Sequence, residues 1–276
     1  MKFGTLRAGW ALVALALIAL AACGDTGSSA LAVKDAVYVR GDLGGVPVRI
    51  PLEFAESVEY DDDPGIMERT PPKAPVRSSS SKLRSFGFDF RYPDMSGPGT
   101  EEARKDKASS SPGNTHWIFV GLIAGQLYHG AGGIERIAAG ILREPDFATK
   151  APYRLVSQKT CGLESYVPDY GRLNGVSNRD NPAAEDIFVD RDAAGNVKTL
   201  IRCRNNLHHA VPCKHHFDLE PHMHARVYLV YRRGMLCDWK GIQGAASRVI
   251  SSFQVDGQAA GQSASSSSYP NNLRGN

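Results

Sequence analysis

Asp186-Ile-Phe-Val-Asp-Arg-Asp-Ala-Ala-Gly-Asn-Val-Lys-Thr-Leu-Ile-Arg-Cys203 is the stretch of this sequence that decides the fold. Two apolar runs stand on either side of a turn at residues 192–196, and this pattern predicts a β-hairpin. Beyond it, Ala225–Tyr231 predicts a further strand. From Trp239 to Phe253 apolar residues keep a spacing of three to four, which predicts a helix with one apolar face. Together these elements predict a sheet with one buried face.

Segments nearer the amino terminus predict more of the same sheet. Val37–Arg40 and Val46–Ile50 are two expected strands, joined by glycines that permit the positive φ angles of a turn. In residues 85–92 aromatic and polar residues alternate, so we expect a strand with a buried aromatic face; core packing is favoured there over a stacking platform for sugars or bases. Trp117–Ile123 predicts a central strand, and Ile134–Ile141 predicts a second helix.

Polar stretches that lack hydrophobic periodicity indicate where loops and the boundaries of the folded domain lie. Residues 69–82 and 96–114 predict surface loops, and the carboxyl end, rich in Ser, Gly and Asn, predicts a disordered tail. We expect a signal peptide (1–22), a lipidated cysteine with a tether (23–35), one folded domain (36–256) and the tail (257–276). The predicted fold class is α+β, mainly antiparallel β-sheet with two covering helices, behind a lipoprotein signal peptide.

The first residues predict export and a membrane anchor. Lys2 and Arg7 precede an apolar run that ends at Leu20-Ala-Ala-Cys23, as in a secretory signal peptide. This run is shorter than the ~20 residues that span a bilayer as a helix. Leu-Ala-Ala-Cys resembles the lipobox of bacterial lipoproteins, which implies cleavage before Cys23 and attachment of lipid, palmitate included, to that cysteine. Gly24 stands where an Asp would favour the inner membrane, so we expect an outer-membrane address facing the periplasm.

Charge and motifs narrow the classes of function. The formal charge of +3 includes Lys2 and Arg7 of the leader, so the remainder carries +1 and has no electrostatic footprint for nucleic acid. The sequence contains no Gly-x-Ser-x-Gly, no His-Glu-x-x-His, no phosphate loop and no dinucleotide fingerprint. We therefore expect a protein that is not an enzyme and uses no cofactor; a hydrolase with an unrecognised site stays open as an alternative.

The cysteines that follow Cys23 predict disulfides. There are four of them, and an even number in an exported protein favours pairing. Four cysteines allow three pairings. Cys203 and Cys213 bracket a short loop after a predicted strand, so they are the favoured pair, which leaves Cys161 for Cys237.

Two groups of polar residues are candidates for contact with a protein partner. One is an acidic loop with Glu59, Asp61, Asp62 and Asp63; the other is a histidine-rich loop with His208, His209, His215 and His216. Calcium is the alternative for the first, but the spacing does not match that of a calcium-binding hand. Zinc is the alternative for the second, but no Cys-x-x-Cys doublet is present and disulfides compete for the thiols. We expect no metal at either loop.

Four stretches together resemble a family of proteobacterial lipoproteins associated with type VI secretion loci. They are Val39–Pro51, Val58–Gly65, Leu83–Met95 and Val227–Trp239, the last with a Tyr-Arg-Arg-Gly core, and the likeness extends over most of residues 37–253. The run of serines at 78–81 and the polar segment after Met95 depart from it. Such lipoproteins lie beside phospholipase effectors. The resemblance therefore implies a periplasmic immunity protein that binds and neutralises a lipase, and it assigns no particular binding residue.

The expected partners are thus a phospholipase effector and, through the lipid on Cys23, the membrane; nucleic acid is not among them. A structural or assembly lipoprotein of the cell envelope is the alternative from another class of function. Gene neighbourhood separates the two, because an adjacent lipase and spike protein are expected only for an immunity protein.

Overall fold

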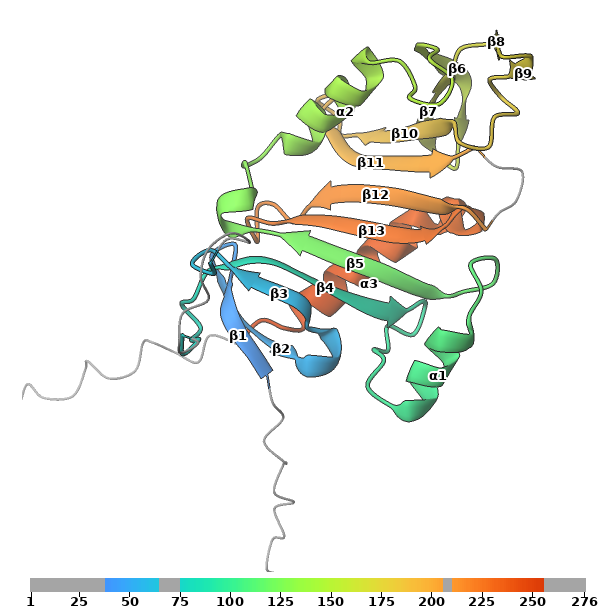
Figure 1. Cartoon of the computed structure of the whole chain (residues 1–276). Helices are drawn as coiled ribbons and strands as arrows, with labels where there is room; N and C mark the ends of the chain where they lie inside the picture. Colours follow the sequence, from blue (N-terminus) through green and yellow to red (C-terminus); the bar gives the residue numbers. More distant parts are fainter. Residues whose placement is uncertain (1–37, 65–74, 206–209, 256–276) are drawn as a thin grey trace, which may run out of the picture. The chain divides into compact units, whose positions relative to one another are not determined.

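The computed structural model describes residues 38–64, 75–205 and 210–255, all of them within the unit Val37–Asn276. In these residues the main element is a nine-stranded sheet in which all neighbouring strands are antiparallel (Figure 1). In their order across the sheet, the strands are β3 (Glu56–Tyr60), β4 (Leu83–Arg91), β5 (Trp117–Ile123), β13 (Arg226–Arg232), β12 (Pro212–Asp218), β11 (Val197–Arg204), β10 (Glu185–Arg191), β7 (Leu163–Pro168) and β6 (Tyr153–Thr160).

Two small hairpins, three α-helices and three short 3₁₀ helices complete the elements of the described ranges. The hairpins are β1 (Tyr38–Leu43) with β2 (Val46–Pro51) and β8 (Arg172–Leu173) with β9 (Val176–Ser177); the α-helices are α1 (Glu101–Ser109), α2 (Gly133–Arg143) and α3 (Trp239–Ser251). The prediction of a mainly antiparallel sheet is confirmed, with three helices in place of two. None of the helices described is long and apolar enough to cross a membrane.

One face of the sheet is closed by α3, which lies across the back of the strands in Figure 1. The predicted aromatic face of β4 points to this side: Phe86, Phe88 and Phe90 are buried, and the ring of Phe253 lies 5.7 Å from that of Phe88. From α3, Trp239 and other apolar residues at helical spacing are buried in the same core. Burying each large apolar side chain contributes about 1.5–3 kcal/mol. We call this side the closed face.

The hairpin β1–β2 extends the closed face beyond the end of α3. The backbone N–H of Arg49 donates to the carbonyl of Phe253 (2.8 Å), and that of Val255 donates to the carbonyl of Pro47 (3.0 Å). The turn between β1 and β2 requires glycine at position 44, where φ is +59° and an added Cβ would lie 2.4 Å from the backbone oxygen of His224. The predicted hairpin is therefore confirmed and is held by the end of the predicted helix.

The opposite face of the sheet is covered only in part. Helix α2 packs on β10 and β11, where its Ile134 and Ala138 join Ile187, Val189 and Leu200 in a second apolar cluster. Helix α1 lies near the end of the sheet at which β5 begins with Trp117. There the indole N–H of Trp117 donates a hydrogen bond to Asp106 (2.8 Å). The middle of this side lacks a helix of the described chain above it. We call this side the open face.

Three stretches that were expected as loops contain regular structure, among them Glu59 of the acidic loop, which belongs to strand β3. Residues 96–114 were expected to form a loop, yet they contain α1, a helix without any buried residue. Its stability comes from Thr100, whose hydroxyl oxygen accepts a hydrogen bond from the backbone N–H of Ala103 (3.1 Å), and from the ion pair of Glu101 with Arg104 (3.1 Å). Such a helix has no apolar periodicity. Residues 212–216 were expected in a loop and belong to strand β12.

Both predicted disulfides are present and the favoured pairing is confirmed. Cys203 and Cys213 are direct partners in the register of β11 and β12, and Cys161 joins Cys237 across 76 residues of sequence. In the chain-entropy model the two cross-links stabilise the fold by about 3 and about 4.5 kcal/mol. The second bond fastens the β6–β7 hairpin to the segment that leads into α3.

A candidate protein-binding groove on the open face

A groove of about 570 Å³ lies on the open face over the middle strands of the sheet. Its residues come from β3, β4, β5, β12, β13 and one position of α2, so segments far apart in the sequence build it. Most of its lining is apolar side chain or glycine. We call it the aromatic groove, after the residues of its floor.

The floor is a row of residues that the register of the strands places side by side. Gly87 of β4 pairs with Gly121 of β5, Gly121 pairs with Tyr228 of β13, and Tyr228 pairs with His216 of β12. Because side chains alternate along a strand, all four lie on the open face, while their neighbours in sequence point to the closed face. Two adjacent glycines leave the backbone of β4 and β5 without side-chain cover of their own.

Aromatic rings fill part of that space and remain accessible. The ring of Phe119 lies beside the glycine pair, since a Cβ added to Gly87 would be 3.2 Å from it and one added to Gly121 would be 3.5 Å away. The Phe119 and Tyr228 rings meet edge to face at 6.4 Å, and the Tyr228 and His216 rings lie 4.9 Å apart. Phe119 is 36% exposed in the middle of the sheet. Accessible aromatic side chains that cluster in one place are enriched at protein-binding surfaces.

One end of the groove holds a buried cation that is already paired. The side chain of Arg226 donates from Nε to Asp218 Oδ1 (2.9 Å) and is 7% exposed. Helix α2 can approach it because residue 133 is glycine; a Cβ there would lie 1.8 Å from Arg226 Nη2. That Nη2 atom is buried and has no hydrogen-bond partner among the described protein groups. The charge of Arg226 is thus balanced by Asp218 and lies beneath the first turn of α2.

The carboxylates at the rim stay accessible, whereas the histidine of the floor is uncharged. Glu56 and Glu59 of β3 have side chains that are 48% and 51% exposed. Burial, together with the nearby cations of Arg202 and Arg226, lowers the pKa of His216 to about 4. At neutral pH the groove therefore combines a neutral aromatic floor with a rim of two accessible carboxylates, which lie 3.6 Å from Lys107 and 3.4 Å from Arg84.

The structure brings together two of the residues that the sequence proposed for partner binding. Glu59 and His216, from the acidic and the histidine-rich stretches, both line the aromatic groove. Phe119, Tyr228 and the glycine pair were not among the candidates. A glycine between two phenylalanines in an alternating strand was an available signal, since glycine inside a strand often marks a close approach of another chain or ligand.

The rest of the acidic loop makes contacts within the protein. Asp62 and Asp63 both pair with the guanidinium of Arg77, whose hydrogen bond lowers the pKa of Asp62. Asp61 Oδ1 accepts a hydrogen bond from the backbone N–H of Gln126 (3.1 Å). Arg77 also stacks on the ring of Tyr60, 4.0 Å from its centroid. The three aspartates therefore support the local fold, and contact with a partner stays a prediction for them.

His215 lies in the core and not on a surface loop, which corrects its assignment as an exposed contact. Its side chain lies on the closed face of β12, and the residue is fully buried. Its Nε2–H donates to Gln243 Oε1 (3.0 Å), and its Nδ1 accepts from the hydroxyl of Tyr231 (3.3 Å). Burial is the main cause that lowers its pKa to about 3. Cys23, His208 and His209 lie outside the described residues.

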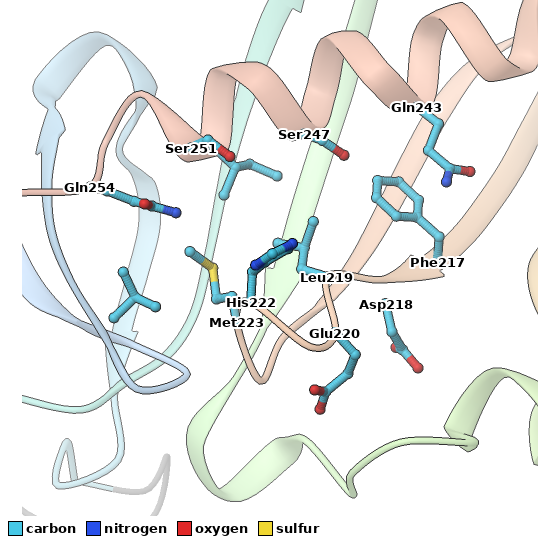
Figure 2. A pocket seen from close by; sticks show the side chains of 12 residues that line it. Phe217, Asp218, Leu219, Glu220, His222, Met223, Gln243, Ser247, Ser251 and Gln254 are labelled. Carbon is cyan, nitrogen blue, oxygen red and sulfur yellow. The ribbon is translucent and has the colours of Figure 1, made fainter.

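A second cleft, of about 540 Å³, lies between α3 and the segment that joins β12 to β13 (Figure 2). Gln243, Ser247 and Ser251 contribute to it from α3, and Glu220 lies on the opposite side. Glu220 accepts a hydrogen bond from the hydroxyl of Tyr128 (2.9 Å), so it is paired within the protein. In the part of the chain that the structure describes, no three His, Cys, Asp or Glu side chains gather to hold a metal ion.

The fold and the groove define an antiparallel-sheet protein with one closed face and one face that carries an accessible groove. No family model and no curated protein matches the chain. Among solved structures it is similar to Smlt3025, described as an immunity protein of the Stenotrophomonas maltophilia type IV secretion system. The match covers 80% of this chain and 94% of that chain, with a TM-score of 0.49 and 17% identity.

Proposed function

We propose that this chain is a lipid-anchored immunity protein that binds and neutralises a phospholipase effector of a type VI secretion system in the periplasm. The observation that carries the proposal is the aromatic groove, an accessible apolar surface on an otherwise well-packed sheet. Contiguous apolar surface on a soluble protein often marks a site where another molecule binds.

The groove has the physical properties that a tight protein contact needs. Its side chains stand on strands of a sheet and are held by cross-strand neighbours, so little conformational entropy is lost when a partner binds. Accessible aromatic groups such as Phe119 and Tyr228 are the residue types that most often dominate binding energy. The effector itself is suggested by the resemblance of the sequence to lipoproteins of type VI secretion loci.

The expected location of the protein, at a membrane surface in the periplasm, supports the same function. A lipid on Cys23 would hold the domain at a periplasmic membrane surface, where a phospholipase must arrive to reach its substrate. Several acyl chains make such attachment effectively permanent. Labelled palmitate should enter the wild-type chain and not Cys23→Ser, and equal labelling of both would contradict the anchor.

Inhibition of a lipase tests the function directly. The mature chain carrying Cys23→Ser should form a stable complex on size-exclusion chromatography with a phospholipase encoded at the same locus, and saturating amounts should abolish its activity on phospholipid vesicles. Heat-denatured chain is the control. Full lipase activity at saturation, together with the lack of a complex, would overturn the proposal.

A further inference from the structure

We infer that the aromatic groove receives a segment of the effector that presents an aromatic or branched apolar side chain with a lysine or arginine next to it. The inference rests on the proposed function and specifies the chemistry of the partner at this site. It commits the groove to a basic and apolar protein segment, and not to an acidic peptide, a phosphate group or a nucleic acid.

The apolar part follows from the shape and chemistry of the floor. The glycine pair of β4 and β5 leaves a space without side chains of its own, bordered by the ring of Phe119 and, beside Gly121, by the ring of Tyr228. Ile123 and Ile137 also belong to the lining, so an inserted ring or branched chain would meet apolar atoms from β5 and α2. Each such side chain contributes about 1.5–3 kcal/mol when its surface leaves water. A polar or charged side chain would lose its hydration on this floor without compensation.

The basic part follows from the balance of charges around the groove. Lys107 lies 3.6 Å from Oε1 of Glu56 and donates to Asp89, while Oε2 of Glu59 accepts hydrogen bonds from Ser85 Oγ (2.9 Å) and from Arg84 (3.4 Å). The side chains of Glu56 and Glu59 are nevertheless 48% and 51% exposed. Both rim carboxylates therefore keep accessible acceptor atoms for a cation of the partner.

Two further groups that line the groove, Arg226 and His216, add no free positive charge. Arg226 is buried and paired with Asp218, and His216 is neutral at pH 7 because its pKa is lowered. The rim as a whole holds three carboxylates, Glu56, Glu59 and Asp89, against the two cations Lys107 and Arg84, so a partner cation is favoured there over an anion.

The manner of contact follows from the irregular edge strand beside the groove. Strand β3 is at the edge of the sheet, and its pairing with β4 shifts register between Glu56 and Glu59 and again before Tyr60. Ser57 in this segment has a φ of +50°. Such bulges protect an edge against the addition of another strand. The partner is therefore expected to contact the open face through side chains rather than extend the sheet.

Affinity measurements on matched variants test the inference. Phe119→Ala should weaken binding of the lipase about thirtyfold, the ~2 kcal/mol of a hot-spot residue. Glu56→Gln with Glu59→Gln should weaken it about threefold and reduce its salt dependence. Phe147→Ala removes a side chain that is 88% exposed and lies outside the groove, so it is the control and should bind as the wild type does. Thermal unfolding of each variant checks that the fold is kept, and the two glutamine substitutions leave the apolar packing unchanged.

Photo-crosslinking identifies the occupant. A benzoylphenylalanine at position 119 should link to one segment of the lipase, and mass spectrometry should find an apolar residue with a lysine or arginine within about one helical turn of it.

The outcomes separate the two proposals. If the wild type neither binds nor inhibits, the proposed function fails and this inference fails with it. If the wild type inhibits while Phe119→Ala and Phe147→Ala bind equally well, the function stands and the groove is not the contact. A cross-linked segment rich in Asp and Glu would overturn the charge assignment.

Discussion

The closed and the open face of the sheet use the same strands for opposite purposes. On β4, the side chain of Phe88 points to the closed face and packs on Phe253. Its neighbour Gly87 lies on the open-face side of the strand and has no side chain, so the groove floor there is bordered by the Phe119 ring. On β12, His215 is sealed beneath α3 and His216 lines the groove. The alternation of side chains along a strand therefore separates stability from recognition within pairs of adjacent residues.

This comparison predicts that substitutions of similar chemistry have different effects on the two faces. On the closed face a change should lower the free energy of unfolding and affect binding only through the folded fraction. On the open face a change should alter binding while the free energy of unfolding stays nearly constant. The four predictions that follow run from the largest expected effect to the smallest.

Phe88→Ala is expected to lower the free energy of unfolding by about 3–5 kcal/mol, because it leaves a cavity among buried aromatic rings. Phe119→Ala, on the open face, should lower it by less than about 1 kcal/mol. Urea denaturation followed by tryptophan fluorescence measures both. Equal losses would show that the open face carries as much of the stability as the closed face does.

Removal of the buried Cys203–Cys213 bond by a double substitution to alanine is expected to lower the free energy of unfolding by about 3 kcal/mol. Because this bond lies on the closed face, the dissociation constant for the lipase should stay within about twofold at temperatures where the variant is folded. A loss of affinity without loss of stability would contradict the separation of the two faces.

Acidification is expected to destabilise the protein through its two adjacent histidines. The folded state lowers the pKa of His215 to about 3 and that of His216 to about 4, below the value of about 6.5 in the unfolded chain. The unfolded chain therefore binds more protons, so the free energy of unfolding is greatest above pH 6.5 and decreases as pH falls toward 4.

His216→Gln isolates the open-face share of this pH effect. The variant should show a smaller decrease between pH 7 and pH 4.5 than the wild type does, as measured by denaturation midpoints. It keeps His215, so a residual decrease should remain. An identical pH profile in both proteins would mean that His216 has an ordinary pKa.

Gly87→Ala is expected to have the smallest effect on stability and a specific effect on the groove. The new methyl group would lie 3.2 Å from the ring of Phe119, so the ring must move by a few tenths of an ångström. Gly121→Ala is the matched control, because its methyl group would meet the same ring at an ordinary 3.5 Å. We expect Gly87→Ala to shift the NMR signals of Phe119 and weaken binding more than Gly121→Ala does. Equal effects would show that the space over β4 is not used.

Much of the fold was predictable because its signals are local. The alternation of aromatic and polar residues predicted β4, and the continuous apolar run of residues 117–123 predicted β5. Apolar residues at helical spacing predicted α2 and α3. The disulfide pairing also followed from position, since Cys203 and Cys213 flank a short connection. Helix α1 was missed because its contacts are a cap and ion pairs, which leave no apolar period.

The groove needed information that no local pattern contains. Its row of Gly87, Gly121, Tyr228 and His216 depends on the order of four strands and on their register. Residues 87 and 216 are far apart in the sequence, and their proximity exists only after β5, β13 and β12 have paired. Glu59 and His216 were proposed for separate loops, and the sheet places them at one site.

The sequence by itself determined many of the strands and two of the α-helices, the disulfides and the expectation of an exported lipoprotein, because composition and periodicity within a short window are enough for each. The tertiary structure decided which face of the sheet α3 covers and which face stays open. It also decided that His215 is a core residue and His216 a groove residue. The reason is that burial depends on which strands and helices become neighbours, and packing across the whole domain determines this arrangement.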